Sequence, residues 1–229
     1  MEITYIGHSG FLVELEDRCL LFDYYQGEIP PVAFSRPLYV FVSHRHQDHY
    51  NRAVLDFRRE GRDVTYIFSG DIMTGKKAEA NGILRMRAGD EKEIDGMHVW
   101  TLRSTDVGVA FVVEIGGKRL YHAGDLNWWH WEGESEAENR QMEKDYKREI
   151  GRLEGLPIDA AFVVLDPRQE DAFAVGFDWF MRHTDTRQVF PMHQWGDYGI
   201  TEKLCGMVLS APYRQKIRPI HGPGEKFQI

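Results

Sequence analysis

The sequence predicts a layered α/β protein, because a first half rich in short strands is followed by a second half in which helices and strands alternate. In residues 1–123, short runs of β-branched and aromatic side chains are separated by turn-forming residues. In residues 134–220, segments with helical periodicity alternate with apolar runs. No linker or low-complexity tract interrupts the 229 residues, so we expect a single domain over residues 1–229.

The first half is predicted to consist mainly of strands. Gly7-His8-Ser9-Gly10 and Gly116-Gly117 have the composition of tight turns. One helix is expected at Asn51–Glu60 and one helical turn at Lys76–Ala80. The predicted strands are Ile3–Ile6, Phe11–Leu15, Arg18–Phe22, Leu38–Val42, Asp63–Phe68, Ile83–Met86, Lys92–Ile94, Met97–Leu102, Gly108–Ile115 and Arg119–His122.

The second half begins with a predicted amphipathic helix at Glu134–Leu153. Met142, Tyr146, Ile150 and Leu153 follow one another at spacings of four, four and three residues, which places them on one helix face. The remaining predicted elements are the strand Asp159–Leu165, the helix Asp171–His183, the strand Gln188–Met192, a weak helix at Thr201–Ser210, the strand Lys216–Ile220 and a tail over Gly222–Ile229.

Composition excludes several function classes. The net charge is −8 and the pI is about 5.7, so the chain has no overall field that attracts nucleic acid. No apolar run is long enough to cross a membrane, and no leader pattern is found at the N-terminus. Two cysteines, Cys19 and Cys205, do not form a disulfide scaffold. We therefore expect a cytoplasmic protein without membrane partners.

A dense group of metal-binding residue types follows the predicted buried strand Leu38–Val42. Three histidines and one aspartate occur within six residues, namely His44, His46, Asp48 and His49. Extended residues two apart point the same way, so His44 and His46 can converge on one ion. The other two residues of the group can then be directed at a second position close by.

Other predicted strands also end near ligand-type residues. Asp125 closely follows the strand Arg119–His122, and His193 directly follows Gln188–Met192. Because strand ends can meet at one edge of a sheet, we expect both residues to join the first group. Asp23 also ends a strand, and we expect it to hold a ligand histidine in its tautomer rather than to bind metal.

The order His-x-His-x-Asp-His, then strand-Gly-Asp, then strand-His resembles that of the metallo-β-lactamase fold superfamily. The flanking motifs GHSGF at 7–11, LFD at 21–23 and GPGE at 222–225 resemble the branch of the L-ascorbate-6-phosphate lactonase-like (UlaG-like) hydrolases. The resemblance covers essentially the whole chain. It implies a four-layer αββα sandwich with a dinuclear metal site at one edge of the two sheets.

The resemblance also implies how the ligands are divided between two metals. The first metal takes His44 and His46, the second takes Asp48, His49 and His193, and Asp125 bridges both. The superfamily usually supplies a third histidine to the first metal, but residues 102–108 contain none. Asp106, as an oxygen ligand, or a water molecule would fill that position, so a centre with a single metal is an alternative.

Histidine and carboxylate ligands suit zinc, and also manganese or iron. We therefore expect one or two divalent ions, with zinc as the first choice. Such an ion lowers the pKa of its bound water to about 7 and polarises a carbonyl or phosphoryl oxygen. Asp48 is the expected catalytic residue, because it can orient the attacking water or accept its proton.

Four residues are candidates for substrate binding. Trp128 and Trp129 come soon after Asp125, and Trp195 comes soon after His193, so they can form an aromatic wall at the site. For the tryptophans at 128–131, the alternative role is to anchor the following helix to the sheets. His8 is expected to contact the substrate or a ligand, with plain turn packing as its alternative.

The predicted function is therefore metal-dependent hydrolysis of a small-molecule ester, lactone or phosphate-bearing substrate. A nuclease is one alternative, which the acidic balance and the absence of a basic stripe disfavour, so no nucleic-acid partner is expected. A non-catalytic metal-binding sensor is the other alternative, because a site that lacks the third histidine can bind metal without turnover.

Overall fold

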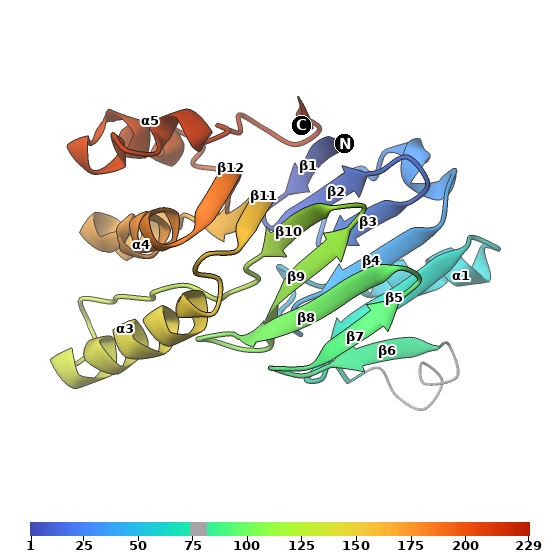
Figure 1. The fold of residues 1–229 in the computed structure, drawn as a ribbon, viewed down its shortest axis with the longest axis horizontal. Helices are drawn as coiled ribbons and strands as arrows, with labels where there is room; N and C mark the ends of the chain where they lie inside the picture. Colours follow the sequence, from blue (N-terminus) through green and yellow to red (C-terminus); the bar gives the residue numbers. More distant parts are fainter. Residues whose placement is uncertain (74–81) are drawn as a thin grey trace. The chain divides into compact units, whose positions relative to one another are not determined.

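The computed structural model describes residues 1–73 and 82–229, and the chain divides into two compact units. Unit 1 comprises Met1–Arg87 and His221–Ile229, and unit 2 comprises Ala88–Ile220. Each unit is built on one β-sheet (Figure 1), in agreement with the predicted α/β class. The helical turn predicted at Lys76–Ala80 lies outside the described residues, and the expectation of a single domain stays a prediction.

Unit 1 contains a seven-stranded sheet in the order β13-β1-β2-β3-β4-β5-β6. The pairs from β13 to β3 are antiparallel, and those from β3 to β6 are parallel. The strands are β1 (Glu2–Gly7), β2 (Gly10–Glu14), β3 (Cys19–Phe22), β4 (Leu38–Val42), β5 (Val64–Ser69), β6 (Ile83–Met86) and β13 (Lys226–Gln228).

The inner strand β4 is buried along its whole length, as is typical of strands in parallel sheets. On one face, Val40 and Val42 join an apolar cluster that also includes Val54 and Phe57. These last two residues come from the 3-10 turn η2 (Arg52–Leu55) and the single-turn helix α1 (Asp56–Arg59). The helix predicted at Asn51–Glu60 is therefore present, but its first half is 3-10 helix. Another 3-10 turn, η1 (Pro31–Phe34), precedes β4.

Unit 2 contains a six-stranded sheet in the order β12-β11-β10-β9-β8-β7. The pairs among β10, β11 and β12 are parallel, and the others are antiparallel. The strands are β7 (Glu91–Ile94), β8 (Met97–Arg103), β9 (Val109–Ile115), β10 (Lys118–His122), β11 (Pro157–Val164) and β12 (Asp185–Met192). The helical elements are α3 (Glu136–Gly151), η3 (Pro167–Ala172), α4 (Val175–His183), α5 (Gly199–Gly206), η4 (Val208–Ser210) and η5 (Arg214–Lys216).

Helices α3 and α4 lie on one side of this sheet (Figure 1). Tyr121 of β10 stacks on Phe180 of α4, with ring centroids 5.0 Å apart. Helix α3 begins with a capping box, in which the Ser135 side chain accepts from the Glu138 backbone and Glu138 reaches back to the Ser135 backbone. The helix predicted at Glu134–Leu153 is confirmed over Glu136–Gly151, and Tyr146 and Ile150 of its predicted apolar face are buried. In the described part of the chain, no helix is long and apolar enough to span a membrane.

One predicted strand is wrong. Lys216–Ile220 does not form a strand, because Lys216 ends the 3-10 turn η5 and only an isolated bridge links Ile217 to Val189. Pro219 lacks the N–H that an extended ladder would need. The tail that follows instead supplies β13, which pairs with β1.

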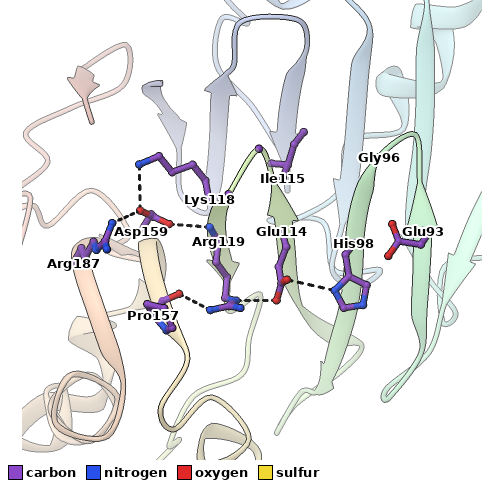
Figure 2. Close-up of a pocket in the computed structure, with 12 residues that line it drawn as sticks. Glu93, Gly96, His98, Glu114, Ile115, Lys118, Arg119, Pro157, Asp159 and Arg187 are labelled. Carbon is purple, nitrogen blue, oxygen red and sulfur yellow. Dashed lines mark hydrogen bonds and ion pairs between the residues drawn. The ribbon is translucent and has the colours of Figure 1, made fainter.

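One edge of the sheet in unit 2 borders a pocket of about 370 Å³ that is lined mainly by charged side chains, several of them in ion pairs (Figure 2). Asp159 accepts hydrogen bonds from the Arg119 backbone at 2.9 Å, from Arg187 at 2.8 Å and from Lys118 at 3.3 Å. His98, on the outer face of β8, contacts Glu91 at 2.7 Å. Because the protein itself matches these charges, we interpret the row of ion pairs as structural.

The pH dependence of stability tests this interpretation. The hydrogen bond to Glu91 raises the pKa of His98, so its stabilisation is complete below the unfolded pKa of about 6.5 and is lost as the pH rises through the folded pKa. We compare the free energy of unfolding in urea of metal-free wild type with that of His98→Gln. As the pH rises from 5.5 to 9, the excess stability of wild type should fall by about 0.5 kcal/mol. Glu91→Gln should reduce the same pH dependence, and a difference independent of pH would contradict this account.

Candidate metal centre

In unit 1, the parallel strands β3 and β4 end side by side and deliver a carboxylate and a hydroxyl to the same edge. Phe22 pairs with Phe41, and the chain then continues into Asp23 and, two residues beyond Phe41, into Ser43. Asp23 accepts hydrogen bonds from the Ser43 backbone at 2.7 Å and from Ser43 Oγ at 2.5 Å. Both side chains are buried, so this edge of the sheet is fixed by a charge-assisted network.

Two histidines of the ligand-type group that follows β4 form hydrogen bonds with this network. His49 Nδ1 lies 2.8 Å from Asp23 Oδ2, and His44 Nδ1 lies 2.9 Å from Ser43 Oγ. The Ser43 hydroxyl donates to Asp23, so it accepts from His44, and one carboxylate therefore sets the tautomer of both rings. In that tautomer, the basic lone pair of each ring is on Nε2. The two ring centroids lie 4.2 Å apart.

Ligand-type atoms of Asp23, His44 and His49 lie within 4.8 Å of one another. The carboxylate of Asp23 already accepts from Ser43 and His49, so we assign it to holding the histidines and not to binding metal. This agrees with the role expected from the sequence.

The other two residues of this group, His46 and Asp48, also lie near other histidine rings. The His46 ring is 4.6 Å from that of His44, centroid to centroid, at an angle of 84°. Asp48 Oδ2 lies 3.3 Å from Nε2 of His8, which is in the turn between β1 and β2. Burial acts to raise the pKa of Asp48, but the interactions with His8 and His49 outweigh it and hold that pKa well below its usual range. Asp48 is therefore an ionised hydrogen-bond acceptor at neutral pH.

Unit 2 repeats the arrangement at the ends of its parallel strands. Asp125, Asp166 and His193 follow β10, β11 and β12, respectively. His193 Nδ1 lies 2.8 Å from Asp166 Oδ2, and His193 Nε2 lies 3.3 Å from Asp125 Oδ1. All three side chains are buried. A second histidine is thus held by a carboxylate on one nitrogen and presents the other to a ligand-type aspartate.

Asp166 has further partners. Arg168 donates to both of its oxygens, with Nη2 2.6 Å from Oδ2, and the Trp195 indole donates at 3.2 Å. Burial acts to raise the pKa of Asp166, but the hydrogen bonds from His193 and Arg168 outweigh it and lower that pKa to about 2. The carboxylate is therefore ionised, and Nδ1 of His193 is the donor.

The sequence of the chain identifies its family. Residues 2–139 match the model of the "Beta-lactamase superfamily domain". A UPF0173 metal-dependent hydrolase of Symbiobacterium thermophilum is 31% identical over 217 residues, which cover 87% of this chain and 86% of that protein. The chain belongs to the β-lactamase superfamily. A UPF0173 metal-dependent hydrolase of Pyrobaculum neutrophilum is 29% identical over 206 residues, with 84% of each chain covered.

Solved structures show the superfamily fold. The metallo hydrolase Igni18 of Ignicoccus hospitalis has a TM-score of 0.65 at 18% identity, with 100% of this chain and 98% of that chain covered. The metallo-β-lactamase fold protein YhfI of Bacillus subtilis has a TM-score of 0.65 at 13% identity, with 99% of both chains covered. The predicted metallo-β-lactamase fold is thus confirmed, and the UlaG-like branch stays a prediction.

Several residues with strained backbone lie in or beside the candidate ligand groups of units 1 and 2. His8, Asp23, His193 and Trp195 have φ values of 54°, 40°, 66° and 51°, in the left-handed region that side chains rarely adopt. Such residues cost about 1–3 kcal/mol each and persist where surrounding contacts hold them. Hydrogen bonds of Asp23 and Asp166 supply those contacts for Asp23, His193 and Trp195, and Asp48 supplies one for His8.

The predicted substrate-binding tryptophans have different surroundings. Trp129 is buried, donates to the Asp125 carbonyl at 3.0 Å and meets the His193 ring edge-on, with centroids 5.7 Å apart. Trp195 also meets the His193 ring edge-on and is 50% exposed. The Trp128 ring instead contacts Trp179 and Lys147, which favours the anchoring role for this residue.

Asp106, the suggested extra ligand, has an exposed side chain in the loop after β8. Its backbone N–H donates to Ser104 Oγ at 3.1 Å. Its role as a ligand stays a prediction.

Sequence reasoning missed two residues that organise these groups. Ser43 directly precedes the histidine motif and joins His44 to Asp23. Asp166 ends a buried strand on a carboxylate, which is the same signal that Asp23 gives. A consistent search for Asp at the ends of buried strands would have found Asp166.

Asp23→Asn tests the network of unit 1. Asparagine tolerates the left-handed backbone, but it cannot accept three hydrogen bonds as a buried carboxylate does. We expect the free energy of unfolding of metal-free protein to fall by about 3 kcal/mol. Urea unfolding measures this, and Asp17→Asn on the surface should leave the midpoint unchanged. An unchanged midpoint for Asp23→Asn would contradict the assigned network.

Proposed function

We propose that the chain is a hydrolase that uses a metal-activated water on a small-molecule ester, lactone or phosphate-bearing substrate. The observation that carries the proposal is the buried carboxylate that holds a histidine Nδ1 at 2.8 Å in each unit. Metal-binding histidines almost always donate their other nitrogen in this way. The proposed ligands are His44, His46, Asp48, His49, Asp125 and His193.

The chemistry of these donors fits a divalent ion. His44, His49 and His193 each have Nδ1 engaged by a hydroxyl or a carboxylate, so the basic Nε2 is the natural ligand atom. Asp48 and Asp125 add carboxylate oxygens. Nitrogen and oxygen donors together suit zinc first, and also manganese or iron. One or two ions, with Asp106 as a further oxygen donor, remain part of the proposal.

A divalent ion bound by these residues would supply a hydroxide at neutral pH and polarise the substrate oxygen. Asp48 would orient the attacking water through its carboxylate, and His8, 3.3 Å away, would hold that carboxylate in place. Trp129 and Trp195 would exclude bulk water beside His193, to whose ring both pack.

Features of unit 2 support a small substrate. A pocket of about 180 Å³ is lined by Trp131 and Arg168, among others. Trp131 stacks on Trp129, and Arg168 lies over Trp195, which connects the pocket to the tryptophans beside His193. A space of this size accommodates part of a small molecule, and the net charge of −8 disfavours a nucleic acid.

Metal content and turnover test the proposal together. We expect purified wild type to contain at least one divalent ion per chain and to hydrolyse a member of a panel of esters, lactones and phosphodiesters. His49→Ala and Asp125→Ala should each lose metal and at least 100-fold in kcat/KM, because each deletes a proposed ligand. Elemental analysis and initial rates measure these quantities.

The exposed His221 offers a matched control, since His221→Ala should keep both metal and activity. Retained activity in either ligand variant would contradict the ligand assignment. Full metal occupancy without turnover on the whole panel would instead favour the sensor, and turnover of phosphodiesters in nucleic acid alone would favour the nuclease.

A further inference from the structure

Three loops of unit 2 are joined by a buried polar network that the proposed chemistry does not use directly. Thr105 follows β8, Asn127 follows β10, and Gln169 follows β11. Asn127 and Gln169 are 2% and 3% exposed, so their amide groups depend on protein partners. Thr105 Oγ1 donates to the Asn127 carbonyl at 2.6 Å and accepts from the Asn127 N–H at 3.1 Å.

The amide groups form a chain with one direction. Asn127 Nδ2 donates to Gln169 Oε1 at 2.8 Å, and Gln169 Nε2 donates to the Trp128 carbonyl at 2.9 Å. Turning the Gln169 amide over would place N–H against N–H at one end and oxygen against oxygen at the other. Only one orientation therefore satisfies both ends, which fixes the distance between the two loops.

Close packing holds Asn127 in this orientation. A Cβ atom added to Gly176, in the first turn of α4, would lie 2.1 Å from Asn127 Oδ1 and 3.0 Å from the Trp128 N. Neither neighbour is the end of a flexible surface chain. Glycine is therefore required at 176 by the approach of the helix to this loop.

The two loops joined by this chain also carry Asp125, a proposed metal ligand, and Asp166, which holds His193. Asp125 lies two residues before Asn127, and its carbonyl accepts from Trp129. Asp166 lies three residues before Gln169, whose N–H donates to the Asp166 carbonyl at 3.2 Å, and Asp166 in turn holds His193. The hydrogen bond between Asn127 and Gln169 thus connects the segment that contains Asp125 to the segment whose Asp166 orients His193.

We infer that Asn127 and Gln169 are positioning residues, which set the separation of Asp125 Oδ1 and His193 Nε2 for metal binding. The inference rests on the proposed function only in assigning these two atoms to a metal. Apolar side chains of the same shape can replace a buried amide pair at little cost in stability, so the polar pair contributes geometry more than stability.

Zinc binding by metal-free protein tests the inference. Gln169→Met keeps the length of the side chain and removes both hydrogen bonds, and we expect it to weaken the zinc Kd 10- to 100-fold. Gln169→Glu still accepts from Asn127 but turns an oxygen toward the Trp128 carbonyl, so it should weaken the Kd as well. Gln141→Met, the same change on the exposed face of α3, should bind as wild type does.

Gly176→Ala perturbs the same network through Asn127 instead of Gln169. It should displace Asn127 and weaken the zinc Kd, whereas Gly206→Ala in α5, where an added Cβ has nothing within 4 Å, should not. For every variant, calorimetric titration of the folded, metal-free protein gives the Kd, and thermal unfolding gives stability separately. If kcat is measurable, Gly176→Ala should lower it while KM stays within about threefold, since Gly176 does not line the pocket of about 180 Å³.

The outcomes separate the two proposals. Wild type that binds no zinc, manganese or iron would overturn the proposed function and this inference together. Wild type that binds zinc, with Gln169→Met, Gln169→Glu and Gly176→Ala all binding equally well but unfolding at lower temperature, would overturn the inference alone and make the network purely structural. Should Gln169→Met fail to fold, the isosteric Gln169→Glu still decides.

Discussion

The hydrogen bond from an imidazole Nδ1 to a buried carboxylate is the interaction on which the candidate ligand groups of both units depend. In unit 1, Asp23 holds His49 directly and His44 through Ser43. In unit 2, Asp166 holds His193. A hydrogen bond to a charged group contributes about 1.5–3 kcal/mol, and here it also selects the tautomer. Without it, either ring nitrogen could carry the proton and the lone pair would have no fixed direction.

The parallel strands explain why the same device occurs in both units. Neighbouring parallel strands end at the same edge of a sheet, so a carboxylate after one strand and a histidine after the next meet without a long loop. Reaching this geometry requires left-handed backbone at Asp23 and His193. The charge-assisted hydrogen bonds offset that strain, and the buried Asn127–Gln169 pair adds a second connection in unit 2.

The candidate ligand residues are easier to recognise in the sequence than the residues that hold them in place. His44, His46, Asp48 and His49 are recognisable because four ligand types follow a buried strand at short spacing. Asn127 and Gln169 are common residue types whose roles depend on contacts across 41 and 42 positions, which no local pattern encodes. The predicted strand Lys216–Ile220 is wrong for a different reason. Its isoleucines suit a strand, but Pro219 has no N–H with which to extend the ladder.

The tautomers of the three held histidines are the most direct measure of this account. Long-range proton–nitrogen correlation spectra of metal-free protein report which nitrogen of each ring carries the proton. We expect His44, His49 and His193 to be protonated at Nδ1, and their Nε2 signals to shift when zinc is added. Protonation at Nε2 in these rings, or Nε2 signals that zinc leaves unchanged, would contradict the account.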